Sequence, residues 1–251
     1  MCSSDLTYNE ADNLRELVAA ILDLDIGVQV LVVDDNSPDG TGQLAEQLSR
    51  SWPEAVRVLH RPGKLGLGTA YCAGFEFGLD RAYRYFVTMD ADFSHPPARI
   101  PALLAAASAN DVVIGSRYVP GGQVVGSPFK RRLLNRGANL LAAFLLHLPA
   151  RDCTAGFRCY RRHVLETVDF RGILSEGYSF LIEMLYHCQQ AGFTICEVPI
   201  TFRDRARGRS KISRIEIFKA FHTLLRLRTP LLPWRRLARI PAPRSSSCSG
   251  R

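Results

Sequence analysis

Two carboxylates separated by a single residue follow an apolar run in the first half of the chain. Asp90 and Asp92 come directly after residues 85–89, whose apolar character predicts a buried strand. Carboxylate oxygens are preferred ligands of Mg²⁺ and Mn²⁺, and an ion held there could neutralise a diphosphate leaving group. A lone D-x-D pair is weak evidence, because acidic pairs at loop mouths are usually solvated turn residues. The neighbouring motifs must decide between the two interpretations.

A second acidic pair, Asp34 and Asp35, closes another apolar run at residues 28–33, and Tyr8 and Glu10 stand near the start of the chain. Carboxylates can accept hydrogen bonds from the edge of guanine and from ribose hydroxyls, and an aromatic ring can stack on a base. If the fold brings the two acidic pairs together, they could bind a nucleotide and its diphosphate. The pattern therefore favours an enzyme that uses a nucleotide donor.

The elements that must position these residues alternate between helix and strand patterns. The expected helices are 13–24, 41–48, 69–79 and 100–107, and the expected strands are 28–33, 56–59, 85–89 and 111–115. Such alternation predicts an α/β fold with a mostly parallel sheet and flanking helices, in which ligands bind at the carboxyl ends of the strands. Both acidic pairs lie at such ends.

The start of the chain departs from this plan. An α/β nucleotide-binding domain normally opens with an apolar strand, but residues 2–6 are too polar to supply one. We therefore expect the first strand to be missing or truncated. The remaining domain is expected to span residues 1–228, followed by a basic, disordered tail at 229–251 that is rich in Pro, Ser and Arg.

Charge and hydropathy indicate where the chain meets its partners. Of 32 Lys and Arg and 24 Asp and Glu residues, 14 basic and only 2 acidic ones lie between Arg203 and Arg251. Such a basic block suits phosphorylated ligands, anionic lipid or nucleic acid, or is simply a solvated tail. Residues 130–148 and 215–227 have amphipathic helical patterns that would suit a membrane interface as well as a protein core. The sequence has no apolar run of about 18 residues, the length needed to span a bilayer.

The seven cysteines are scattered, with no C-x-x-C pair and no metal-ligand spacing. They suggest neither a disulfide framework nor a zinc site, so we expect a reducing location on the cytoplasmic side of a membrane.

Five motifs in this order specify a family. They are TYNE at 7–10, VVDDNSPDGT at 32–41, GKLGLGTAYCAGF at 63–75, MDADFSHPP at 89–97 and GSRY at 115–118. Together they resemble the dolichol-phosphate (polyprenol-phosphate) mannosyltransferases, which are family-2 inverting glycosyltransferases with a GT-A fold. Further segments extend the resemblance over residues 7–228. The DDNSPDGT and GLGTAY segments favour mannosyl over glucosyl relatives.

The resemblance implies a role for each matched residue. Guanosine contacts are implied for Tyr8, Glu10, Val33 and Asp35, and metal and diphosphate contacts for Asp90 and Asp92. Ala91, between the two carboxylates, would contact the nucleotide sugar. Arg117 would bind donor and acceptor phosphates, Arg131 and Asn135 would receive the lipid phosphate, and Arg205 and Lys211 would belong to a basic loop that closes over donor and acceptor. The residues expected to act in catalysis are Asp92, Arg117, Arg205 and Lys211, with Mg²⁺ or Mn²⁺ as cofactor.

The charges imply a mechanism for the transfer of mannose from GDP-mannose to polyprenyl or dolichyl phosphate. The lipid phosphate is already an anion, so it can attack the anomeric carbon without a general base, and the centre is inverted. Catalysis would then rest on positioning and electrostatics. No histidine is expected to act as a base, and His95 is interpreted as a surface or packing residue, although it lies close to the acidic pair. Glu183 could orient a basic loop residue, and a plain surface glutamate is an equally good interpretation.

Three positions depart from the family pattern. Leu6 replaces a proline, Ser94 stands where some relatives have a metal-binding glutamine, and Asn135 stands where many have serine. Only two side-chain metal ligands are therefore expected, with water or donor phosphates completing the shell.

Several alternatives remain open. The donor could be UDP-glucose or an amino-sugar nucleotide, and the chain could be a non-catalytic membrane-binding or nucleic-acid-binding module. Nucleotidyl transfer is less favoured, because no glycine-rich, lysine-bearing loop precedes Asn13. Aromatic residues that could stack on bases are sparse in the basic region, so no nucleic-acid partner is expected. The enzyme would meet its lipid by peripheral adsorption or through small membrane-anchoring subunits.

Overall fold

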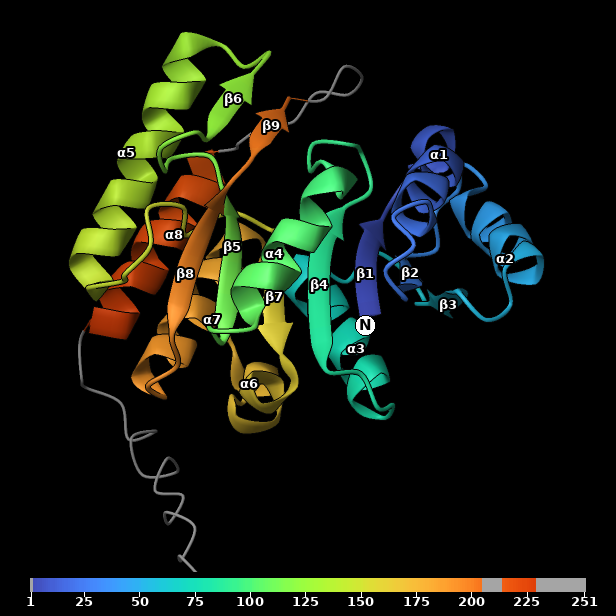
Figure 1. Cartoon of the computed structure of the whole chain (residues 1–251). Coiled ribbons are helices and arrows are strands. Elements are labelled where there is room, and N and C mark those ends of the chain that lie inside the picture. Colours follow the sequence, from blue (N-terminus) through green and yellow to red (C-terminus); the bar gives the residue numbers. More distant parts are fainter. Residues whose placement is uncertain (1, 205–213, 229–251) are drawn as a thin grey trace, which may run out of the picture.

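The computed structural model describes residues 2–204 and 214–228, with side chains described from 7 to 204 and from 221 to 228. A seven-stranded sheet forms the centre of the molecule, and helices cover both of its faces (Figure 1). Its strands are β1 (Cys2–Thr7), β2 (Gln29–Asp34), β3 (Val56–His60), β4 (Tyr85–Asp90), β5 (Val112–Ser116), β7 (Arg158–Arg161) and β8 (Ile195–Pro199). The predicted α/β class with a mostly parallel sheet is confirmed.

The strand order is β3-β2-β1-β4-β7-β5-β8. β1 to β4 are mutually parallel where they pair, and β5 is parallel to β8, but β7 pairs antiparallel with both β4 and β5. Because β7 runs the other way, the residues that precede it lie at the same edge of the sheet as the carboxyl ends of its neighbours. The segment from Arg151 to Phe157 therefore reaches the edge where the acidic pairs lie.

Alternation along the strands divides the core into two layers. In β2, Val30 and Val32 face one layer, while Leu31 and Val33 face the other. The first layer contains buried residues of α1 (Ala11–Leu22), α2 (Thr41–Ser51) and α4 (Ile100–Ala107), and the second contains residues of α3 (Leu67–Leu79), α6 (Arg162–Thr167) and α7 (Tyr178–Gln190). A strand buried on both faces is expected to be a continuous apolar run, which is the pattern found at residues 30–33.

The expectation of a missing first strand was wrong. Cys2–Thr7 forms β1 and lies between β2 and β4, with both pairings parallel. Main-chain hydrogen bonding on both sides accounts for a strand that side-chain hydropathy did not predict, because the ladder satisfies the backbone whatever the side chains are.

The residues predicted to bind the acceptor lie on elements next to the β8 edge of the sheet. α5 (Phe129–Leu146) and α8 (Arg214–Arg228) contact each other at one end of the molecule, and α8 also contacts α7 (Figure 1). A short parallel pair, β6 (Gln123–Val125) and β9 (Thr201–Arg203), lies beside the upper end of α5 in Figure 1. Both amphipathic segments are thus confirmed as helices. The predicted tail at 229–251 lies outside the described residues.

Candidate active site

The register of three strands brings the two acidic pairs to one edge. Leu6 of β1 is the partner of Val33 on one side and of Asp90 on the other, and Thr7 is the partner of Asp34. The carboxyl ends of β2, β1 and β4 therefore lie side by side. The Oγ1 of Thr7 donates a hydrogen bond to the carbonyl of Val33, which ties the ends of β1 and β2 together.

One half of this edge has groups suited to a nucleoside. Asp35 is buried, and its Oδ1 lies 3.3 Å from Nη1 of Arg61, which is buried too. Burial raises the pKa of Asp35, although the charge of Arg61 opposes the shift. Neither Asp35 Oδ1 nor Arg61 Nη1 has a hydrogen-bond partner among the described residues, so both could pair with polar groups of a ligand.

The other predicted nucleoside contacts differ in their surroundings. Tyr8 is exposed at the edge, and Nζ of Lys64 lies 4.3 Å from its ring centroid. Glu10 stands just before α1 and accepts a hydrogen bond from Asn13. The side chain of Val33 is buried in the core, so any contact with a nucleotide would have to come from its main chain.

The second acidic pair is held in place by its own loop. Oδ1 of Asp92 accepts a hydrogen bond from the main-chain N–H of Ser94. The N–H of Asp90 donates to Nδ1 of His95 at 3.0 Å, so the proton of the neutral ring must sit on Nε2. His95 is buried and stacks on Phe157, and burial lowers its pKa. His95 is thus a packing residue, as predicted, and it also anchors the end of β4.

The space in front of Asp90 is kept open by Gly156. A Cβ added at Gly156 would lie 3.5 Å from Oδ1 of Asp90 and 2.8 Å from the hydroxyl of Tyr71. Within the described residues there is no group of three or more His, Cys, Asp and Glu side chains that could hold a metal ion. Two carboxylates two residues apart, with open space beside Asp90, suit a hard cation such as Mg²⁺ or Mn²⁺, whose remaining ligands are oxygens of water or phosphate.

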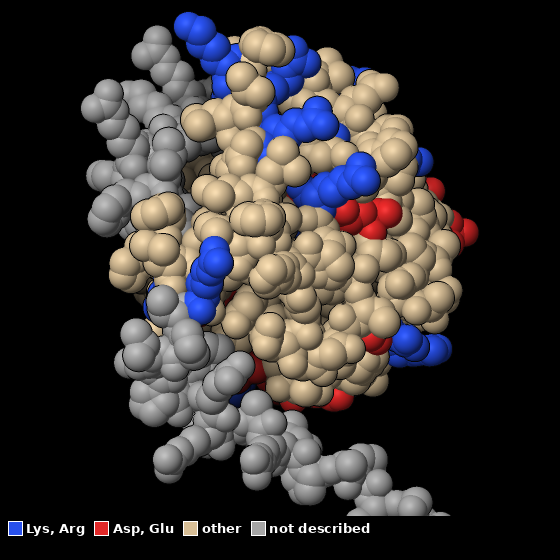
Figure 2. All heavy atoms as spheres, turned by 90° about the vertical axis from the view of Figure 1, so that its left-hand side faces the viewer, with Lys and Arg blue, Asp and Glu red and all other residues tan. Residues whose placement is uncertain are grey.

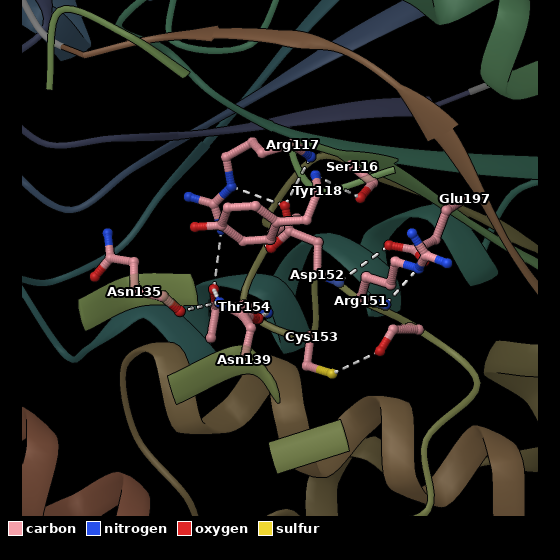
Figure 3. Close-up of polar contacts among 12 residues, drawn as sticks. Ser116, Arg117, Tyr118, Asn135, Asn139, Arg151, Asp152, Cys153, Thr154 and Glu197 are labelled. Atoms are coloured by element: carbon pink, nitrogen blue, oxygen red, sulfur yellow. Dashed lines mark hydrogen bonds and ion pairs between the residues drawn. The ribbon is translucent and has the colours of Figure 1, made fainter. Parts of the chain in front are cut away.

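Arg117, which directly follows β5, is paired with a fully buried carboxylate, that of Asp152 (Figure 3). Its Nε and Nη2 lie 2.8 and 2.6 Å from the two oxygens of Asp152, and its main-chain N–H also donates to Asp152. Nη2 donates further to Thr154. Burial alone would lower the pKa of Arg117, but the charge of Asp152 raises it above its usual value. The guanidinium is therefore permanently charged and fixed in orientation.

The Asp152 loop is itself fixed by its neighbours. Glu197 of β8 accepts hydrogen bonds from the main-chain N–H groups of Arg151 and Asp152. Asn139 of α5 donates to the hydroxyl of Thr154 and accepts from its N–H (Figure 3). These contacts join α5, β8 and the loop before β7 around Arg117.

A cavity of about 230 Å³ connects Asp90 with the two amphipathic helices. Asp90, His95 and Arg117 line it together with residues of α5, α7 and α8, of the loop before β7, and of the β6 and β9 region. The helix residues that line it include Arg131, Leu134, Asn135, Leu141, Phe221 and Leu224. The structure therefore places the predicted acceptor residues Arg131 and Asn135 in one space with Asp90 and Arg117.

Nη1 of Arg131 forms an ion pair with Asp204 at 2.9 Å. Asp204 directly precedes Arg205, which with Lys211 was expected to form a basic loop. Arg205 and Lys211 both lie outside the described residues.

Sequence reasoning singled out neither Asp152 nor Asn139 as a site residue. Both lie within segments that carry the family resemblance, which was the available signal. Asp152 reaches Arg117 directly and Asn139 reaches it through Thr154, and both arrangements depend on the loop that precedes the antiparallel strand β7. The interpretation of Glu183 as a surface residue was wrong. Its carboxylate is buried and accepts hydrogen bonds from Arg226 and Ser175.

Comparison with known proteins places these features in context. Residues 6–169 match the model of glycosyl transferase family 2. The chain is 48% identical over 215 residues to polyprenol monophosphomannose synthase from Mycolicibacterium smegmatis, covering 85% of this chain and 81% of that protein. It is 45% identical over 207 residues to undecaprenyl-phosphate mannosyltransferase from Micrococcus luteus, covering 82% of this chain and 85% of that protein.

Among solved structures, glucosyl-3-phosphoglycerate synthase from Mycobacterium tuberculosis, in complex with Mn²⁺, UDP and glucosyl-3-phosphoglycerate, is similar with a TM-score of 0.64. The match covers 90% of this chain and 79% of that one at 20% identity, so it supports the fold alone.

Proposed function

The chain belongs to glycosyl transferase family 2, and we propose that it transfers mannose from GDP-mannose to a polyprenyl or dolichyl phosphate with inversion at the anomeric carbon. The observation that carries this proposal is the cavity that joins Asp90 to α5 and α8. A sugar donor held at the acidic end and a lipid phosphate entering between the helices would meet in this one space. The relatives named as mannosyltransferases of polyprenol or undecaprenyl phosphate support the same assignment.

The nucleoside half of the donor is assigned to Tyr8, Glu10 and Asp35. Asp35 supplies acceptor oxygens and its neighbour Arg61 supplies donors, so the pair can satisfy a base or ribose that carries both kinds of group. Val33 lies near the end of β2 and Ala91 directly follows β4, so their main-chain atoms lie at the same edge of the sheet. GDP-mannose is favoured over UDP-glucose because the relatives in the comparison are mannosyltransferases.

Asp90 and Asp92 would hold the metal, because they offer carboxylate oxygens two residues apart and Asp90 faces the open space at Gly156. A bound Mg²⁺ or Mn²⁺ would supply charge neutralisation for the departing diphosphate. His95 keeps the end of β4 in position through the N–H of Asp90. Arg117 presents a fixed positive charge to phosphate groups, and its orientation comes from Asp152 and Thr154.

The acceptor phosphate is assigned to Arg131 and Asn135. These residues are four apart on α5, so their side chains lie on the same face of the helix. A phosphate held there would carry its own negative charge to the anomeric carbon and would need no base. This fits the cavity, whose histidine has a pKa lowered by burial and is used to hold the main chain. Arg205 and Lys211 remain assigned to the phosphates by the family resemblance.

We assign the protein a peripheral position on a membrane, which the surface of α5 supports, and its cytoplasmic side rests on the scattered cysteines alone. No helix in the described part of the chain is long and apolar enough to cross a bilayer. Phe129, Leu133, Leu140 and Phe144 of α5 are exposed large apolar residues, with Phe144 at 73% exposure. Figure 2 shows the face that carries α5 as largely uncharged, with Lys and Arg side chains along its upper part. Exposed apolar groups flanked by basic ones suit adsorption to an anionic lipid surface, alone or beside small membrane-anchoring subunits.

The test is transfer of radiolabelled mannose from GDP-mannose to a short polyprenyl phosphate in detergent with Mg²⁺ or Mn²⁺. Label should enter the organic phase only with metal present, and Asp92→Ala should abolish the transfer. UDP-glucose and an amino-sugar nucleotide, offered in parallel, identify the donor. Transfer from UDP-glucose but not from GDP-mannose would replace the mannosyl assignment. No transfer from any donor would favour a non-catalytic binding protein.

A further inference from the structure

The acceptor end of the cavity holds an ion pair that crosses from α5 to the end of β9. Nη1 of Arg131 lies 2.9 Å from Oδ2 of Asp204, with the two side chains 30% and 14% exposed. Both residues line the cavity. The Asp204 carboxylate is therefore paired with Arg131, the residue that the proposed function assigns to the lipid phosphate.

This pair differs from the other arginine–carboxylate pair in the cavity. Asp152 is fully buried and accepts three hydrogen bonds from Arg117, so that pair is a fixed part of the fold. The carboxylate of Asp204 makes a single hydrogen bond among the described residues, and it is partly exposed. A partly exposed ion pair held by one hydrogen bond is weaker than the two-pronged pair of Arg117 with Asp152.

The main chain of Asp204 is anchored independently of its side chain. Its N–H donates a hydrogen bond of 2.9 Å to the carbonyl of Val125, which continues the pairing of β6 with β9. The carboxylate can therefore turn away from Arg131 without disturbing the strand.

Arg131 also has unused binding capacity. Its Nε is buried and has no hydrogen-bond partner among the described residues. A guanidinium binds phosphate through two parallel N–H groups, whereas Asp204 engages only Nη1. Asn135, one turn further along α5, and Ser127 line the same part of the cavity and can add hydrogen bonds. A phosphate would thus satisfy Arg131 better than Asp204 does.

We propose that Asp204 occupies the phosphate position on Arg131 in the acceptor-free enzyme, and that a polyprenyl phosphate binds by displacing it. The proposal rests on the function proposed above. A phosphate brought beside the Asp204 carboxylate is repelled by it, so the carboxylate must leave. An uncharged lipid alcohol has no charge with which to compete for Arg131. Asp204 therefore competes with phosphorylated lipids and not with their alcohols, and it lowers the affinity of the site for the phosphate.

The test measures binding of farnesyl phosphate and of farnesol to the full chain in detergent, without donor, by isothermal titration calorimetry. Asp204→Asn should lower the Kd of farnesyl phosphate about three- to tenfold, the range expected from removing one partly exposed competing ion pair. Asp204→Glu should restore the wild-type Kd. Farnesol binding should be the same in all proteins. Asp204→Ser gives a second neutral variant in case Asp204→Asn folds poorly.

Glu166→Gln is the matched control. It removes one negative charge from an exposed ion pair with Arg162, on a helix that contributes no residue to the cavity, so the Kd should not change. In the transfer assay, Asp204→Asn should lower the KM for the acceptor and leave the KM for the donor unchanged. A residue that merely supports the fold would raise both values.

An unchanged or raised Kd for farnesyl phosphate in both neutral variants would overturn the proposal, because Asp204 would then be orienting Arg131 for the phosphate. If no protein binds farnesyl phosphate, both this inference and the proposed acceptor fail. If binding tightens in Asp204→Asn while GDP-mannose proves inert, the donor assignment fails and the role of Asp204 stands.

Discussion

Arg117 and Asp152 face each other as a two-pronged pair, with Nε and Nη2 of the arginine bonded to separate oxygens of a carboxylate that has no exposure to solvent. Breaking such a pair leaves a buried charge without its partner. We expect Asp152→Asn to lower the free energy of unfolding by about 3 kcal/mol. Urea unfolding measures the change. The exposed ion-pair variant Glu166→Gln should change little, and an equal loss in both would show that burial of the Arg117 pair has no special importance.

Gly156 is predicted to tolerate no side chain while Tyr71 keeps its hydroxyl. The added Cβ would lie 2.8 Å from that hydroxyl, and we expect Gly156→Ala to cost about 1–3 kcal/mol of stability through overpacking. Tyr71→Phe removes the clashing hydroxyl, which has no hydrogen-bond partner among the described residues. The double variant should therefore recover most of the loss in a thermal unfolding cycle.

Gly137 on α5 is the control for this series, because a Cβ added there meets no atom within 4 Å. Gly137→Ala should be neutral or stabilising, since alanine favours a helix. A loss in Gly137→Ala equal to that in Gly156→Ala, or no recovery in the double variant, would contradict the steric explanation.

Glu183 should make the stability of the protein sensitive to acid. Burial alone would raise its pKa, but hydrogen bonds from His187 and Ser175 and the charge of Arg226 hold the pKa below the ordinary value of 4.5. The unfolded chain therefore binds a proton more readily than the folded one, so stability falls as the pH drops below about 4.5 and through the lower folded pKa. We expect Glu183→Gln to be less stable at pH 7 and to lose less stability between pH 5 and pH 3. Denaturant unfolding across this range measures both slopes, and equal slopes would contradict the assignment.

The exposed apolar residues of α5 should control adsorption to membranes. Replacing Phe144 or Leu140 with glutamine removes a large apolar group from the exposed face of the helix. Each change should reduce partition onto anionic vesicles about tenfold, because burial of one such side chain contributes about 1.5 kcal/mol or more. Vesicle co-sedimentation at fixed salt measures the effect. Ile26→Gln, an exposed position in the turn after α1, is the control and should leave partition unchanged.

The sequence predicted the parts of the fold that depend on local pattern. The helix expected at residues 100–107 is α4, and the run at 28–33 is β2 shifted by one residue. Strand β1 was missed because hydropathy, the signal used, does not report main-chain pairing on both sides of a strand. The antiparallel direction of β7 has no local signature, because it depends on which strands its backbone meets.

For the site, the sequence predicted residues within local motifs and missed their partners from distant parts of the chain. The motifs identified Asp90 and Arg131, and the structure brings both to the same cavity. The partners that hold the predicted arginines, Asp152 and Asp204, are 35 and 73 residues away in sequence. Only the folded sheet brings them close, so spacing along the chain could not reveal them. Whether Arg205 and Lys211 approach the phosphates stays a prediction.

The antiparallel strand β7 also separates the sheet into two groups of strands. The strands that carry the donor-side residues, β1 to β4, are joined to β5 and β8 only through β7. Under the proposed function, the residues assigned to the donor and those assigned to the acceptor would be encoded in consecutive stretches of the gene, the first ending near Asp92 and the second beginning near Arg117. A chimera that keeps the first stretch and exchanges the second with a relative should inherit its nucleotide sugar from one parent and its lipid from the other.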